Sequence, residues 1–199
     1  MNTYISLPDD PIVITLPGGQ KSGFSNSIFP WGACSTTNQA KGDTGTQLVL
    51  PCMKAAGVDC KKINGGGDIE HPPYKSEVKF LVETLVETSL GLNREWRFNG
   101  VRPDQDDWHN LYVVVQQGDH ASNEVLVIEF TREATLRMIE AGDITFYGQQ
   151  QKGDDGTKTN VIEFRAHDNS RRSEIKDHLL PYANNIVRIP QHTITINYT

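Results

Sequence analysis

The sequence lacks any apolar run near the length of about 20 residues that a membrane-spanning helix needs. Its first four residues carry neither the basic nor the apolar region of a secretory signal. We therefore expect no membrane association and no signal peptide. The expected location is the cytoplasm or an assembled particle.

Basic residues are in deficit. The 199 residues include 19 Lys and Arg against 25 Asp and Glu, which gives a formal net charge of −6. Proteins that bind nucleic acid broadly need a basic surface that can release counterions. The charge balance therefore argues against nucleic acid as a partner.

Cysteine is scarce, and its odd count excludes a fully paired set of disulfides. Cys52 and Cys60 are close enough in sequence to close a small disulfide loop, although reduced thiols are the expectation for a chain without a signal peptide. Cys34, Cys52, Cys60 and His71 could supply four zinc ligands, but they lack the closely spaced cysteine pair that is typical of zinc sites. We expect no metal and no cofactor.

Glycine and proline are concentrated in one part of the chain. Residues 1–73 hold 10 of the 17 glycines and 7 of the 10 prolines, a density that interrupts both helices and sheets. The chain is predicted to divide into an irregular arm or cap over residues 1–73 and a regular domain over residues 74–199. Within the arm, residues 12–16 and 46–50 are predicted to be short strands.

The clearest predicted helix covers residues 75–90. Val78, Leu81, Val82 and Leu85 follow the spacing i, i+3, i+4 and i+7, which places them on one helical face. Gly91 is suited to end such a helix. This element is expected to pack as a long helix on the sheet.

The rest of the chain alternates between β-branched runs and turns. Two hairpins are predicted from this pattern, one pairing residues 111–115 with 125–128 and the other pairing 144–147 with 161–164. Further predicted elements are a short strand at 96–98, helices at 131–141 and 173–180, and strands at 186–189 and 193–198. The fold class is therefore α+β: a twisted antiparallel sheet with one long helix on a face, preceded by an irregular Gly/Pro-rich N-terminal arm.

Four apolar side chains in the arm are candidates for an interaction site. Phe24, Ile28, Phe29 and Trp31 are too apolar for a free linker. They are expected to pack either on the core of their own chain or on a neighbouring subunit.

A cysteine hydrolase is one alternative function. It needs a thiolate beside an imidazole, and Cys34 with His71, His109 or His120 could provide that pair. Nothing in the sequence places Cys34 at a helix N-terminus, where its pKa would fall.

A metal-dependent nuclease would need an acidic residue followed two places later by lysine. Thr131 follows Glu129 at that spacing, and Arg165 follows Glu163. Both glutamates are therefore interpreted as residues on the polar faces of strands.

A module that binds a small molecule or a glycan is a further alternative. Trp96, Trp108 and Tyr112 could supply stacking surfaces near the junction of helix and sheet. Core packing is the competing role for these three side chains.

The motifs indicate no known family. The leading hypothesis is a non-enzymatic structural or interaction subunit that self-associates, as a homo-oligomer or within a larger assembly such as a virion or sheath. The aromatic anchors of the arm and the sheet edges, which another chain could extend, motivate this hypothesis.

Overall fold

A computed structural model gives the fold of the chain. It describes residues 3–16, 38–64, 68–81, 84–88, 91–95, 97–101, 107–116, 124–141, 145–151, 158–165 and 179–198.

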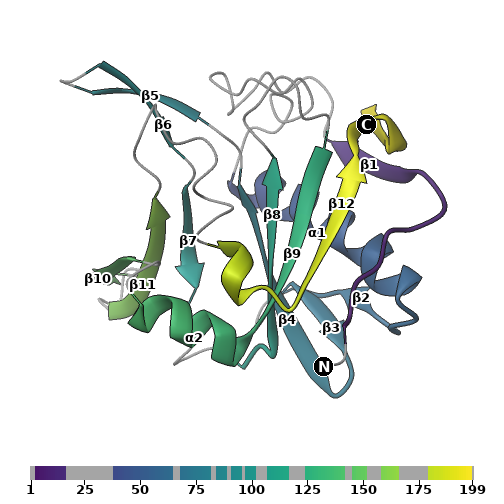
Figure 1. Cartoon of the computed structure of the whole chain (residues 1–199), viewed down its shortest axis with the longest axis horizontal. Helices are drawn as coiled ribbons and strands as arrows, with labels where there is room; N and C mark the ends of the chain where they lie inside the picture. Colours follow the sequence, from purple (N-terminus) through teal and green to yellow (C-terminus); the bar gives the residue numbers. More distant parts are fainter. Residues whose placement is uncertain are drawn as a thin grey trace.

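The main sheet has six strands and lies at the centre of the molecule (Figure 1). All neighbouring strands are antiparallel except β4 and β8, which run parallel. This confirms the predicted α+β class with a mostly antiparallel sheet. The strands stand in the order β12 (Asn185–Pro190), β9 (Glu124–Thr131), β8 (Asn110–Gln116), β4 (Tyr74–Leu81), β3 (Ile69–His71) and β2 (Lys61–Lys62).

A long helix, α1 (Asn38–Ala55), packs against β4 and β1 (Ile12–Leu16). It covers one face of the main sheet, and its buried side chains Leu48 and Met53 join the core there. The predicted long helix on a sheet face is therefore present, but it lies in a different part of the chain from the one predicted.

Residues 75–90, predicted as the long helix, instead contain two strands, β4 and β5 (Thr84–Thr88). In β4 the buried side chains Ser76, Val78 and Phe80 alternate with charged residues, which is the two-residue period of a strand. The i, i+3, i+4, i+7 match that favoured a helix was thus a chance overlap with this alternation.

The converse error affects residues 46–50, which were predicted as a strand and lie inside α1. Gly42, Gly45 and Pro51 disfavour a helix, and for this reason the region was predicted to be irregular. Gly45 is in the helix because of close packing: a Cβ there would lie 3.1 Å from Val78 Cγ1 and 3.2 Å from Phe80 Cβ. Tertiary packing on β4 therefore outweighs weak helix propensity.

Three smaller sheets surround the main one. β1 pairs in parallel with β13 (Ile194–Tyr198), and β5 forms a hairpin with β6 (Gly91–Glu95). The third sheet has the order β10 (Thr145–Gln151), β11 (Lys158–Arg165) and β7 (Arg97–Val101). In the described part of the chain, the short 3₁₀ helices η2 (Leu180–Tyr182) and η3 (Gln191–Thr193) precede β12 and β13 respectively.

Both predicted hairpins are confirmed, as β8–β9 and β10–β11. The predicted helix at 131–141 is confirmed as α2 (Arg132–Glu140), and its N-cap is Thr131, whose Oγ1 accepts the Ala134 N–H at 3.1 Å. Met138 is buried on this helix, whereas Leu136 is 40% exposed. The predicted helix at 173–180 lies almost entirely outside the described residues.

The core has two parts, one on each face of the main sheet. Side chains along β8 alternate between them: Tyr112 and Val114 lie on the α1 side, and Leu111 and Val113 lie on the side that α2 covers. This division determines which residues can meet at a site on either face.

Candidate functional site

A row of buried polar side chains crosses four strands on the α1 face of the main sheet. Ser76 of β4 is in register with Asn110 of β8, and Tyr112 of β8 is in register with Glu129 of β9. His71 of β3 extends the row beyond Ser76. Each of these five side chains is 2% exposed or less. We call this set the polar row.

Hydrogen bonds run the length of the polar row. His71 Nε2 and Ser76 Oγ are 2.6 Å apart, and the Ser76 side chain also bonds the Tyr112 hydroxyl. Asn110 Nδ2 donates to Tyr112 Oη at 3.5 Å and to Glu129 Oε1 at 3.2 Å. The network satisfies most of these buried polar groups, which would otherwise carry a high free-energy cost, but Asn110 Oδ1 has no hydrogen-bond partner among the described residues.

Residues 3–16, which we call the N-terminal segment, dock over the end of the polar row. The Tyr4 N–H donates to both carboxylate oxygens of Glu129 at 3.3 Å, and Asn185 Nδ2 donates to the Ile5 carbonyl oxygen at 2.7 Å. The Ser6 N–H donates to the Cys52 carbonyl oxygen at 2.9 Å. The start of the segment is thus bonded to β9, β12 and α1.

Burial controls the electrostatics of the polar row. It raises the pKa of Glu129 to about 7, against the opposing effect of hydrogen bonds from the Tyr4 N–H and the Asn184 side chain. Burial also raises the pKa of Tyr112, while burial and the neighbouring His109 lower the pKa of His71. His71 is therefore neutral at neutral pH.

Four rings cluster at the His71 end of the polar row. Tyr74 stacks on His109 with ring centroids 4.1 Å apart, and the Tyr4 ring lies 5.6 Å from His71 and 6.2 Å from His109. Two of the histidines named as catalytic candidates are thus close together. They pack against tyrosines from the N-terminal segment and from β4.

The contact between Ser76 and His71 has the geometry of a nucleophile and its base. However, Ser76 has no exposed surface, and its side chain also bonds Tyr112. A substrate cannot reach Ser76 in this conformation. The contact therefore serves to satisfy two buried polar groups.

Of the remaining candidates from the sequence, the structure describes Trp108 and Tyr112, and it does not bring these two together. Trp108 and Tyr112 are 1% and 0% exposed and lie on opposite faces of the sheet, so neither offers a stacking surface for a ligand. The other predicted site residues lie outside the described part of the chain: Phe24, Ile28, Phe29, Trp31, Cys34, Trp96 and His120.

The two described cysteines are free thiols, so the small disulfide loop that their spacing allowed does not form. Both belong to the core between α1 and the main sheet. Cys52 lies on α1 itself, and its thiol donates to the Leu48 carbonyl oxygen at 3.3 Å. Burial raises the pKa of Cys52 to about 12, which makes this thiol a poor nucleophile at neutral pH. Among the described residues, no group of three or more His, Cys, Asp or Glu could hold a metal ion.

Sequence reasoning missed Glu129, the residue at the β9 end of the polar row. Glu129 was interpreted as a polar-face residue, but β9 is buried on both faces and Glu129 has no exposed surface. The signal was the composition of the strand, which places one glutamate within an otherwise apolar run from Val125 to Phe130.

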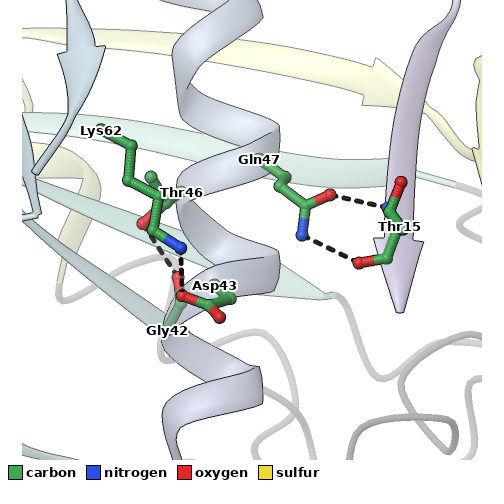
Figure 2. Close-up of polar contacts among 6 residues, drawn as sticks. All are labelled: Thr15, Gly42, Asp43, Thr46, Gln47 and Lys62. Atoms are coloured by element: carbon green, nitrogen blue, oxygen red, sulfur yellow. Dashed lines mark hydrogen bonds and ion pairs between the residues drawn. The ribbon is translucent and has the colours of Figure 1, made fainter. Parts of the chain in front are cut away.

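A second set of contacts holds the far end of the N-terminal segment. Ile12, Ile14 and Leu16 of β1 are buried, whereas Val13 faces solvent. The Gln47 amide of α1 bonds both backbone groups of Thr15, accepting its N–H at 2.6 Å and donating to its carbonyl oxygen at 3.1 Å (Figure 2). The same figure shows the neighbouring ion pair between Lys62 and Asp43, 2.6 Å long.

Comparisons with protein-family models, curated proteins and solved structures find no match to this chain. Neither helix in the described ranges combines the length and apolar character needed to cross a membrane.

Proposed function

We propose that the protein is a non-enzymatic structural or interaction subunit that self-associates. The main support comes from the five large apolar side chains that are exposed in the described part of the chain. Three of them, Leu7 (50%), Val13 (52%) and Tyr198 (59%), lie on the N-terminal segment or on β13, its partner strand. The register places Val13 and Tyr198 on opposite faces of the β1–β13 pair, so Val13 is the apolar side chain of the outward face. Exposed apolar side chains of this kind support a role in protein–protein contacts.

The burial of the reactive groups favours a structural role over a catalytic one. His71, Ser76 and Glu129 have almost no exposed surface. His71 is hydrogen-bonded to Ser76, and Glu129 accepts the Tyr4 N–H of the N-terminal segment. A catalytic acid, base or nucleophile must be within reach of a substrate. These groups instead stabilise the docking of the N-terminal segment.

A second copy is the proposed partner because the exposed face of the β1–β13 pair is uncharged. With a net charge of −6, two copies of the chain carry a net repulsion that an uncharged contact face does not add to. The outward residues here are Val13, Thr15, Thr195 and Asn197, so two copies can meet without like-charge contacts. A larger particle of the virion or sheath type would extend the same contact.

Sedimentation velocity over a wide concentration range tests this proposal. We expect the average mass to rise with concentration, and Val13→Lys to weaken the association roughly tenfold or more because a charge replaces a buried apolar contact. Leu136→Lys on α2 is the matched control, since it makes the same kind of change at another exposed position. A strict monomer at high concentration would overturn the proposal.

A further inference from the structure

We infer that the outer edge of β13 pairs in antiparallel orientation with β13 of a second copy, so that two β1–β13 pairs join into one sheet. This inference rests on the proposed self-association and names the strand edge through which two copies meet. β1, the partner of β13 within the chain, lies at the rim of the molecule (Figure 1).

β13 has an edge to which another strand can bond. Among the described residues it pairs with β1 and with no other strand. Successive residues of a strand point their backbone groups alternately toward one neighbouring strand and away from it. Thr195, Ile196 and Asn197 are consecutive, so at least one of them directs its N–H and C=O away from β1. Such groups at a sheet edge are a template for an added strand.

The edge of β13 lacks the protection that other outer strands carry. Both lysines of β2 form ion pairs, and the Gln47 amide bonds both backbone groups of Thr15 on β1. β13, by contrast, has neither a charged residue nor a proline between Ile194 and Tyr198. Charges, proline and covering groups are the usual means by which proteins prevent pairing at an edge. Their absence from β13 favours an edge that is bonded in the assembled protein.

The sequence of β13 is complementary to itself. When the five residues overlap fully with an antiparallel second copy, Ile196 lies opposite Ile196, Thr195 opposite Asn197, and Ile194 opposite Tyr198. Apolar residues thus meet apolar or aromatic ones, and uncharged polar residues meet each other. No pair brings together like charges, which would be destabilising. A two-fold arrangement of this kind closes at two copies.

The exposure of Tyr198 supports a second copy as the occupant of this edge. The register with Leu16 places Tyr198 on the inward face of the β1–β13 pair, yet Tyr198 is 59% exposed. Ile194, on the same face, is only partly buried against the core. In the joined sheet, Tyr198 of each copy covers Ile194 of the other. An aromatic ring opposite a β-branched residue is a favourable cross-strand pair.

The edge contact adds to the face contact of the proposed function. Pairing about Ile196 keeps Thr195 and Asn197 of both copies on one side of the joined sheet, the side on which Val13 and Thr15 lie. Two small uncharged faces therefore become one larger face. The pair of copies is closed by the edge, and further association would use this face.

Disulfide trapping between two copies tests the pairing. A copy carrying Thr195→Cys and a differently tagged copy carrying Asn197→Cys would be mixed, both with Cys34→Ser, and oxidised under native conditions. Opposite residues of an antiparallel pair have Cα atoms about 4.5–5.5 Å apart, within the range that a disulfide requires. Non-reducing gels separate the mixed dimer from dimers of identical copies by their tags.

If β13 pairs in this register, the mixed dimer should exceed its statistical share several-fold, because Thr195 lies opposite Asn197 and not opposite itself. If sedimentation shows an oligomer but the mixed dimer does not exceed its statistical share, pairing at β13 is overturned and self-association stands. A strict monomer overturns both.

Tyr198→Ala gives a second measurement that needs no cysteine. It should weaken the association severalfold in sedimentation velocity, because the ring that covers Ile194 of the other copy is lost. Tyr74→Ala is the matched control, since Tyr74 is a 42% exposed tyrosine on β4. Equal association of the two variants would contradict the contact between Tyr198 and Ile194.

Discussion

At the scale of single residues, Glu129 is the most consequential side chain in the described structure. It is a carboxyl group with no exposed surface, and the groups around it are neutral: the Tyr4 N–H, the amides of Asn110 and Asn184, and the Tyr112 phenol. A buried carboxylate without a cation nearby is costly to ionise. Glu129 therefore couples the fold to pH.

We expect the stability of the protein to fall as pH rises from about 4.5 to about 7. In the folded state burial raises the pKa of Glu129 to about 7, so in this interval the folded state binds more protons than the unfolded state. The stabilisation is complete below the ordinary pKa of glutamate and is lost as pH rises through 7, by roughly 2–3 kcal/mol. Urea unfolding at a series of pH values measures this slope.

Glu129→Gln should remove most of that slope and should stabilise the protein above neutral pH, because the glutamine carries no charge. Glu124→Gln is the matched control on the same strand, since Glu124 is partly exposed and pairs with Arg188 at 3.2 Å. Equal pH slopes for the wild type and Glu129→Gln would show that the carboxyl group titrates normally.

At this scale the sequence is a weak guide to the polar row. A glutamate within an apolar run could have been recognised as buried, but Ser76 could not, because the same residues also matched a helix start. Asn110 and Tyr4 carry no local signal at all. Their roles arise from contacts with residues 19 and 125 positions away, which local patterns do not encode.

At the scale of elements, the packing of α1 on β4 depends on the absence of a side chain at Gly45. We expect Gly45→Ala to be less stable than Gly42→Ala by about 1–2 kcal/mol. Its methyl group would press on Phe80 Cβ, which is fixed to a central strand, whereas nothing lies within 4 Å of a Cβ at Gly42.

Gly42→Ala serves as the control for helix propensity, and it should stabilise α1 by up to about 1 kcal/mol. Thermal and urea unfolding of both variants measure the difference. If the two substitutions stabilise equally, the sheet accommodates the methyl group and close packing does not explain Gly45.

The strand pairings that the sequence predicted correctly are those between strands that are neighbours in the sequence. β8–β9 and β10–β11 are hairpins in which β-branched runs flank a turn, so all the information is local. The parallel pairs β4–β8 and β1–β13 were beyond this approach, since their strands are far apart in sequence. The long helix was expected from composition and period but was placed on the wrong segment.

At the scale of the whole molecule, the two edge strands of the main sheet, β2 and β12, are protected against pairing with another chain. β2 has two residues, and both lysines form ion pairs, Lys61 with Glu70 and Lys62 with Asp43. On β12, the Ile186 N–H is bonded to Asn185 Oδ1. Charge, short length and side-chain caps are the usual means of protecting sheet edges. The sequence-based idea that another chain extends the sheet is therefore not supported at these strands.

β1 is protected by α1. Gln47 bonds both backbone groups of Thr15, as Figure 2 shows, and Pro11 offers no N–H two residues before Val13. Val13 thus lies between Pro11 and Thr15, two positions at which an added strand could not form the backbone hydrogen bonds of a sheet. The proposed self-association would therefore use side-chain contacts at this strand.

We expect Gln47→Leu to promote aggregation through β1 and to cost about 1 kcal/mol of stability, because both bonds to Thr15 are lost. Light scattering and a dye that binds cross-β structure, followed during prolonged incubation, measure the effect. Lys54→Leu on the same helix is the control for added apolar surface, since Lys54 is exposed. Equal aggregation of the two variants would argue that Gln47 does not guard this edge.

The order in which a ribosome makes the chain decides when the N-terminal segment can dock. The segment is made before the residues it docks on: Asn185, the partner of Ile5, follows 180 residues later, and β13 follows later still. The full set of contacts that buries Ile5, Ile12, Ile14 and Leu16 is therefore complete only after β12 and β13 have been made. Until then, the nascent chain exposes apolar side chains of the N-terminal segment, to which chaperones or other copies translated from the same mRNA can bind.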